Sequence, residues 1–181
     1  MFQIRIHGRG GQGVVTAAEL LSVAAFLEKK YAQAFPSFGS ERMGAPVTAF
    51  CRISDKEIRL REPILEPNAL IIQDKTLLGS SDVFNGIVDN GYVFINSPSK
   101  VENNLKNINL MCIDATGIAL EHIGKPIPNA VLLGSFAALT GIIKIDSVIE
   151  AIKAKFSGVM GEKNIDAAVA AYEKTKIGGV V

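Results

Sequence analysis

A glycine-rich turn near the amino terminus constrains the fold more than any other stretch of this 181-residue sequence. Apolar side chains alternate with polar ones before the turn, at Phe2, Ile4 and Ile6, which is typical of a β-strand. After the turn, from Val14 to Leu27, apolar and small residues recur at spacings of three and four, which indicates a helix with one buried face. A strand, a turn and a helix in this order predict the first βα unit of an α/β fold.

The turn has the spacing Gly8-x-Gly10-x-x-Gly13. Glycine tolerates positive φ and lets bare backbone approach a ligand, and the first N–H groups of the following helix point toward any anion placed there. Arg9 and Gln12 can reach phosphate or carboxylate groups from this position. The candidate ligand-binding residues are therefore Gly8, Arg9, Gly10, Gly11, Gln12 and Gly13, with Gly10, Gly11 and Gly13 as backbone donors.

The same spacing is the fingerprint of NAD- and FAD-binding proteins. That fingerprint also requires an acidic residue about 20 positions later, at the end of the second strand. Glu28 has this spacing but falls in the predicted helix, which extends to about Lys30, and the second strand, residues 31–35, ends without an acid. The sequence therefore favours a dinucleotide site only weakly, and a second alternative is that the glycines merely let the helix pack on the strand.

Further strands and helices alternate along the chain. Strands are predicted at residues 45–53, 57–61, 69–72, 92–95 and 110–113, and helices at 82–90, 116–122, 130–140, 145–156 and 162–175. The strands 45–53 and 57–61 are predicted to form a β-hairpin, and Asn129 is the predicted N-cap of the buried helix 130–140. The predicted fold class is α/β: a Rossmann-like, doubly wound, mostly parallel sheet with a β-hairpin insertion and C-terminal helices, in one domain spanning residues 1–181.

Composition argues against several classes of function. The net charge is +1, so the overall electrostatic potential of the chain does not favour nucleic acid or a membrane surface as a partner. Cys51 and Cys112 are far apart and form no Cys-x-x-Cys pair, so we expect neither a zinc site nor an iron–sulfur cluster within this chain. No apolar run approaches the roughly 20 residues of a membrane helix, and no signal sequence follows Met1. We expect a cytoplasmic protein that recognises its partners through specific surface contacts rather than through its overall charge.

The loop at residues 35–46 is the second informative stretch. It mixes aromatic and charged residues with proline and glycine, and ordering it costs backbone entropy, so it is either an Ω-like cap or a segment that a partner orders. The candidate partner or active-site residues of this loop are Ser37, Phe38, Ser40, Glu41 and Arg42. Arg42 is the preferred anchor, because arginine is enriched at interface hot spots, although Glu41 and Arg42 can equally be a solvated pair.

Other titratable residues have weaker signals. His7 ends the first strand and His122 ends a helix, and both are predicted to be hydrogen-bonded structural residues. Asp74 and Asp114 follow strands at the expected ligand-binding edge, where acids also cap helices or close turns. No catalytic residue and no metal ligand is predicted in this chain.

Three blocks of sequence resemble the gamma subunit of pyruvate or 2-oxoisovalerate ferredoxin oxidoreductases. The blocks are GRGGQGVVTAA at residues 8–18, FPSFGSERMGAPV at 35–47 and NAVLLGSFAALTG at 129–141. The resemblance covers nearly the whole chain. It implies one gamma-type component of an enzyme that cleaves a 2-oxo acid with coenzyme A into acyl-CoA and carbon dioxide and passes electrons to ferredoxin.

The resemblance also implies which parts of the enzyme lie elsewhere. Thiamine diphosphate, magnesium and the iron–sulfur clusters belong to other subunits in this family, so this chain alone is expected to bind none of them, and its partners are alpha-, beta- and delta-type subunits. The form of the second block favours pyruvate as substrate, with branched 2-oxo acids second. We hypothesise that the glycine turn and the 37–46 loop face the thiamine-binding subunits and help form the coenzyme A site. The alternatives are a purely structural clamp or a freestanding dinucleotide-binding protein.

Overall fold

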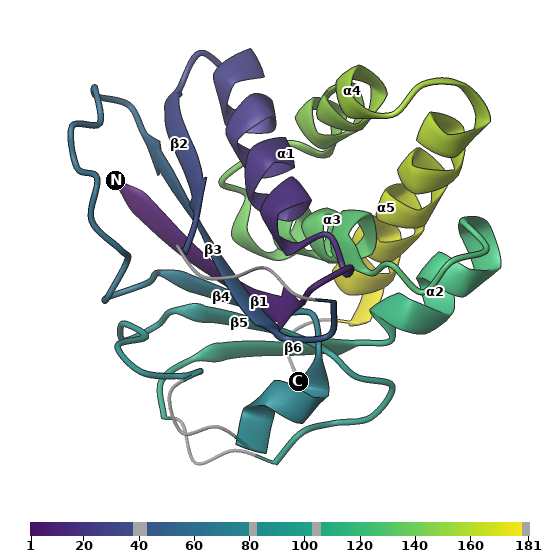
Figure 1. The fold of residues 1–181 in the computed structure, drawn as a ribbon, viewed down its shortest axis with the longest axis horizontal. Coiled ribbons are helices and arrows are strands. Elements are labelled where there is room, and N and C mark those ends of the chain that lie inside the picture. The colour runs from purple at the N-terminus through teal and green to yellow at the C-terminus, as the bar shows by residue number, and fades with distance from the viewer. Residues whose placement is uncertain (38–42, 80–82, 103–105, 179–181) are drawn as a thin grey trace.

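The computed structural model describes residues 1–37, 43–79, 83–102 and 106–178, and these residues form a single mixed sheet with helices packed on it (Figure 1). The strands are β1 (Phe2–Arg9), β2 (Tyr31–Pro36), β3 (Pro46–Ser54), β4 (Ala69–Ile72), β5 (Tyr92–Asn96) and β6 (Asn109–Ile113). Their order is β2-β3-β1-β4-β5-β6. Strands β1, β4, β5 and β6 are parallel neighbours, whereas β3 is antiparallel to both β1 and β2. The predicted α/β class with a mostly parallel sheet is confirmed.

The antiparallel hairpin consists of different strands from those predicted. Strand β3 pairs with β2 on one side and with β1 on the other, so it lies inside the first βαβ unit. The predicted strand at residues 57–61 is wrong, because these residues have no strand structure. Their alternating apolar pattern is compatible with a strand, but β3, the strand with which they were predicted to form a hairpin, already has β1 and β2 on its two edges.

Five α-helices over the described residues cover one face of the sheet (Figure 1). They are α1 (Val14–Leu27), α2 (Ala115–His122), α3 (Asn129–Thr140), α4 (Ile145–Lys155) and α5 (Gly158–Gly178). All five contribute to one apolar core with the sheet. Nine consecutive residues of α3, from Asn129 to Ala137, are buried, as predicted for a helix that is apolar nearly all round. The N-cap of α3 is Pro128 rather than Asn129, and the Asn129 Oδ1 instead accepts from the N–H of Ala130.

The other face of the sheet is covered by a 3₁₀ helix, η1 (Lys75–Gly79), and by turns. Leu77 and Val83 pack there on apolar residues of β4 and β5. The predicted helix at 82–90 is wrong over the described part, where residues 83–86 form turns. Gly86 has a φ of +76° and Asn90 a φ of +58°, and both values interrupt a right-handed helix. No helix over the described residues is long and apolar enough to cross a membrane.

Candidate functional site

Three helix N-termini meet at one edge of the sheet, where the parallel strands have their carboxyl ends. Helix α1 follows β1 through the glycine turn, and α2 begins directly after β6. A Cβ on Gly13 would lie 2.5 Å from the Nδ2 of Asn129, so the start of α3 touches the start of α1. Helix N-termini carry partial positive charge, so this edge is the natural place for an anionic group.

The glycines of the turn allow both a tight turn with positive φ values and close packing of α1 on β1. Gly11 and Gly13 have φ values of +94° and +74°, which side-chain-bearing residues rarely adopt. A Cβ on Gly8 would lie only 2.6 Å from the Cγ2 of Val14, so its absence lets α1 pack closely on β1. Close packing of α1 on β1 is therefore compatible with a turn of the kind that binds anions.

Some backbone N–H groups of the turn donate hydrogen bonds within the protein, and others do not. The N–H of Gly10 donates to the carbonyl of Ala45 at 2.9 Å, and that of Gln12 donates to the carbonyl of Arg9 at 3.0 Å. Across the residues that the structure describes, the N–H groups of Gly11 and Gly13 and of the first turn of α1 have no hydrogen-bond acceptor. Of the predicted donors, Gly10 is thus engaged within the protein, whereas no acceptor among the described residues uses the N–H groups of Gly11 and Gly13.

The side chain of Arg9 links the turn to the segment after β4. Its Nε lies 3.3 Å from the Oδ2 of Asp74, and its Nη2 donates to the Oγ1 of Thr76 at 2.7 Å. Gln12 completes this cluster, because its Nε2 donates to the Asp74 Oδ2 at 2.9 Å and its Oε1 accepts from the N–H of Arg9 at 2.8 Å. Burial alone would raise the pKa of Asp74, but hydrogen bonds from Thr76 and Gln12 and the charge of Arg9 hold it below its ordinary value. Arg9 and Gln12 therefore organise the turn, with Asp74 as their common acceptor.

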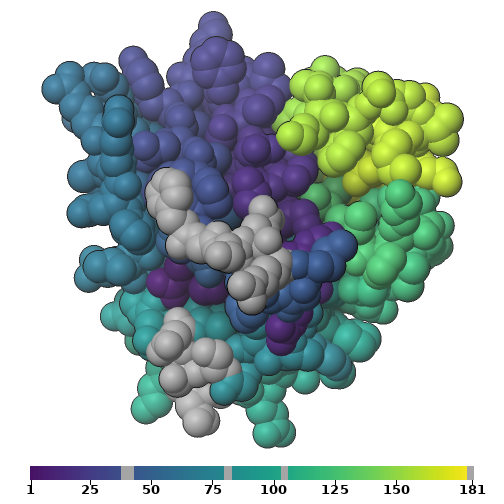
Figure 2. Space-filling view, viewed as in Figure 1, coloured from purple at the N-terminus to yellow at the C-terminus, as the bar shows by residue number. Residues whose placement is uncertain are grey.

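The far end of the 35–46 loop is fixed to the same cluster. The Nη1 of Arg9 donates to the carbonyl of Gly44 at 3.0 Å, and the N–H of Gly44 donates to the carbonyl of Gly10 at 3.1 Å. At the near end, the N–H of Ser37 donates to the carbonyl of Thr48 at 2.8 Å. Figure 2 shows the purple residues of the turn and the blue residues that follow the loop side by side on one face of the molecule. The predicted loop residues Phe38, Ser40, Glu41 and Arg42 lie outside the described residues.

The geometry offers no support for the dinucleotide alternative. Strand β3 separates β2 from β1, so the end of β2 lies two strand spacings, roughly 10 Å, from β1. Glu28 lies at the C-terminal end of α1, where its carboxylate accepts from the N–H of Lys144 at 2.6 Å and from Lys30. A 14-residue helix, about 20 Å long, therefore separates Glu28 from the glycine turn.

Several polar residues at this edge gave no clear signal in the sequence. Asn96 donates to the carbonyl of Gln73 and to Thr116, so it ties the ends of β4 and β5 to the start of α2. Gln73 is fully buried, and within the described part of the chain its amide oxygen and nitrogen have no hydrogen-bond partner. Thr76 was the one detectable case, since a threonine two residues after Asp74 has the spacing of a local side-chain turn.

The remaining candidates are structural. Asp114 accepts from the N–H of Gly117 at 2.8 Å and caps α2. Burial raises the pKa of Cys51 to about 12, so its thiol is inert at neutral pH. Over the described residues, no group of three or more His, Cys, Asp or Glu side chains is arranged to hold a metal ion.

His7 predicts a specific pH dependence of stability. Burial, and secondarily the charge of Arg5, lower the pKa of His7 to about 4, and the neutral Nε2 accepts from the Arg5 Nε at 3.0 Å. Between pH 6.5 and 4 the unfolded chain therefore binds a proton that the folded chain excludes, so the free energy of unfolding falls as pH decreases, by about 2 kcal/mol at pH 5. Urea unfolding at pH 7 and pH 5 measures this change. His7→Gln, which keeps an acceptor but does not titrate, should lose that part of the dependence, and an undiminished fall in the variant would contradict the assignment.

Comparisons with known proteins agree with this architecture over almost the full chain. The family model described as pyruvate ferredoxin/flavodoxin oxidoreductase matches residues 3–174. The chain is 52% identical to the pyruvate/ketoisovalerate oxidoreductases common subunit gamma of Pyrococcus furiosus, over 98% of both chains. It is 51% identical to the pyruvate synthase subunit PorC of Methanothermobacter marburgensis, over 99% of this chain and 100% of the relative.

Solved structures extend the comparison to the fold. The crystal structure of pyruvate oxidoreductase subunit PORC from Thermotoga maritima is 34% identical, with a TM-score of 0.83 over 95% of each chain. A 2-oxoglutarate:ferredoxin oxidoreductase from Magnetococcus marinus has a TM-score of 0.82 over 99% of this chain but only 32% of its own length, and at 16% identity it shows the shared fold alone. The chain therefore belongs to the pyruvate ferredoxin/flavodoxin oxidoreductase family, in which it is a gamma-type subunit and so one part of a multisubunit enzyme.

Proposed function

We propose that this subunit serves a coenzyme A-dependent pyruvate ferredoxin oxidoreductase, where its glycine turn and 37–46 loop form one wall of the coenzyme A site. The observation that carries the proposal is the pairing of unused N–H donors at Gly11 and Gly13 with a loop end fixed to the same turn by Arg9. Such donors suit a phosphate group, and coenzyme A carries several. The reaction is the oxidative decarboxylation of the 2-oxo acid to acyl-CoA, with electrons passed to ferredoxin.

Pyruvate is the proposed substrate, and a branched 2-oxo acid is the second. The Pyrococcus relative is named for both pyruvate and ketoisovalerate, and the Methanothermobacter relative for pyruvate. Substrate choice is assigned mainly to the thiamine-binding subunits. The proposed partners are the alpha-, beta- and delta-type subunits of a cytoplasmic complex, and ferredoxin through that complex.

Over the described residues, no cluster of acidic side chains suits the magnesium of a thiamine diphosphate site, and no set of cysteines suits an iron–sulfur cluster. The two cysteines lie on different strands, and one of them is a buried thiol with a raised pKa. In this proposal the chain binds and orients coenzyme A through backbone N–H groups and excludes water at the subunit interface.

One observation favours the alternative of a structural clamp. The donors of Arg9 are already used by Asp74, Thr76 and Gly44, so the arginine is a positioning residue rather than a direct ligand contact. In a pure clamp the turn would shape the subunit interface without meeting coenzyme A. The two functions differ in what the loss of Arg9 does to binding of coenzyme A and to assembly.

The variant Arg9→Ala distinguishes a coenzyme A-binding role from a structural clamp in the reconstituted complex. We expect normal co-purification and a KM for coenzyme A raised roughly tenfold, because the turn and the loop end lose the arginine that positions them, with the KM for pyruvate unchanged. Arg9→Lys should recover only part of this, because a single ammonium cannot serve Thr76 and Gly44 as the guanidinium does. Arg59→Ala is the control, since Arg59 is an exposed surface arginine paired only with Glu57. An unchanged KM for coenzyme A, or loss of assembly alone, would favour the clamp.

A further inference from the structure

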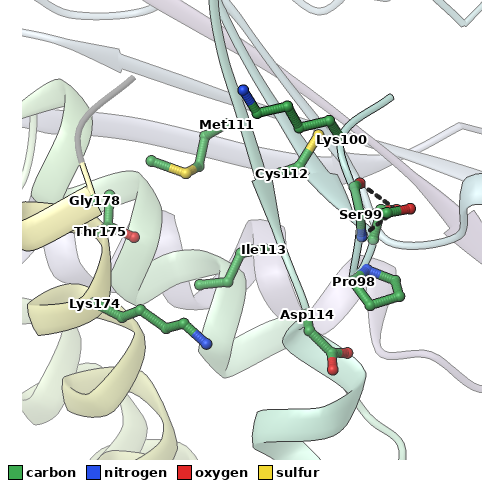
Figure 3. Close-up of a pocket in the computed structure, with 11 residues that line it drawn as sticks. Pro98, Ser99, Lys100, Met111, Cys112, Ile113, Asp114, Lys174, Thr175 and Gly178 are labelled. Atoms are coloured by element: carbon green, nitrogen blue, oxygen red, sulfur yellow. Dashed lines mark hydrogen bonds between the residues drawn. The ribbon is translucent and has the colours of Figure 1, made fainter. Parts of the chain in front are cut away.

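A cavity lies on the same sheet edge as the glycine turn, beside β5 and β6. It is lined by the segment that follows β5, by the edge strand β6 and by the last turn of α5 (Figure 3). Its volume is about 270 Å³. Sites for drug-sized ligands usually exceed roughly 300 Å³, so this cavity suits a molecule of only a few carbon atoms.

A buried hydroxyl in this cavity lacks the partner that it should have. The side chain of Thr175 is 4% exposed, and across the described residues its Oγ1 makes no hydrogen bond. A helical threonine can donate to the carbonyl four residues earlier, and a buried hydroxyl left unpaired is unfavourable. In Figure 3 this oxygen points from α5 toward β6. An acceptor atom in the cavity would satisfy it.

The charges around the cavity favour an anion. Lys174 and Lys100 both line it, and within the described chain neither lysine forms an ion pair. Lys174 extends from α5 across the cavity toward the end of β6 (Figure 3). Asp114 is the one acid among the described lining residues, and its Oδ1 already accepts from the Gly117 N–H. The carbonyl end of α5 favours the ammonium of Lys174 at this position.

The floor of the cavity is apolar. Met111 and Ile113 of β6 line it and are 5% and 4% exposed. A free phosphate ion has no surface to bury on such side chains, whereas a carboxylate on a short hydrocarbon chain does. The ligand should therefore combine one anionic oxygen pair with one small apolar group.

We propose that the cavity between β6, residues 97–100 and the last turn of α5 binds a short-chain carboxylate. Its oxygens accept from Thr175 and Lys174, and its carbon chain lies on Met111 and Ile113. This site is independent of the function proposed for the glycine turn, because it shares none of the turn's residues and needs no coenzyme A.

Calorimetric titration of the full chain with 3-methylbutanoate tests the proposal. We expect a Kd on the order of 1 mM, weakened about tenfold by Thr175→Val and restored by Thr175→Ser. Lys174→Gln should weaken binding about threefold, because the ammonium is exposed. Lys163→Gln, an exposed lysine elsewhere on α5, should leave the Kd unchanged.

Several results would overturn the site. These are no binding by the wild-type chain, equal weakening by Lys163→Gln, and inorganic phosphate binding as tightly as 3-methylbutanoate. Far-ultraviolet circular dichroism of each variant shows that it folds. If Thr175→Val fails to fold, the comparison of Lys174→Gln with Lys163→Gln decides the proposal on its own.

Discussion

Replacing Gly134 with alanine is expected to destabilise the chain by about 3 kcal/mol, the upper range for forcing extra atoms into a packed core. Gly134 is a buried residue in the middle of α3, and a Cβ there would collide with the backbone carbonyl of Ala168 in α5. A side chain can rotate away from an added methyl group, but a helix backbone cannot, so α3 and α5 would have to separate. Urea unfolding of the purified chain measures the loss.

The expected destabilisation by Gly134→Ala is opposite to the effect that helix propensity alone predicts. Alanine in place of glycine inside a helix ordinarily stabilises by roughly 1 kcal/mol. Gly79→Ala is the matched control, since a Cβ there has nothing within 4 Å and its φ lies outside the left-handed region. We expect that control to change stability by about 0.5 kcal/mol or less. A neutral or stabilising Gly134→Ala would show that α3 and α5 do not approach as closely as described.

Local patterns in the sequence predicted most helices and parallel strands. The run from Val14 to Leu27 is a helix, although the predicted extension to about Lys30 is wrong because Lys29 has a positive φ, and the continuous apolar segment 69–72 is a buried strand. These patterns succeed because burial imposes a period on each element separately. Gly134 falls in one such run, but its contact with α5 joins distant parts of the chain, so no local pattern reveals it.

The wrong predictions have the same cause. Residues 57–61 alternate like a strand, but whether they pair depends on β3, whose two edges are taken by β1 and β2. Residues 83–86 form turns, and Gly86 lies against the backbone of residue 65, a contact that a short sequence window does not contain. Both errors concern competition for a neighbour rather than intrinsic preference.

The candidate site likewise has features that local sequence predicted and features that only the tertiary structure shows. The glycine spacing predicted a strand–turn–helix with open N–H groups, and Gly11 and Gly13 have them. It also suggested that Arg9 meets a ligand, whereas the folded chain brings Asp74 and Thr76, more than 60 residues away, to that arginine. The role of Arg9 was therefore set by tertiary structure, and so was the coupling of the turn to the 35–46 loop.

That coupling makes Asp74 the residue whose loss should have the largest effect on function. Asp74 accepts from Gln12, from the N–H and Oγ1 of Thr76, and it pairs with Arg9. Asp74→Ala leaves several of these donors unsatisfied at once, so the turn and the loop end at Gly44 should lose their common anchor. We expect the KM for coenzyme A in the assembled complex to rise about 30-fold, more than for Arg9→Ala, with subunit assembly retained.

The acid at the end of β6 supplies the matched control for Asp74. Asp114 occupies the same edge of the sheet, but its carboxylate caps only α2 through Gly117. Asp114→Ala should therefore cost about 1 kcal/mol of stability, as the loss of an N-cap does, and leave the KM for coenzyme A unchanged. If both variants raise that KM equally, the effect reflects general loosening of the sheet edge. If only Asp74→Ala raises it, the cluster of Arg9, Gln12 and Asp74 positions the turn for coenzyme A, because lost stability alone does not discriminate between two acids on one edge.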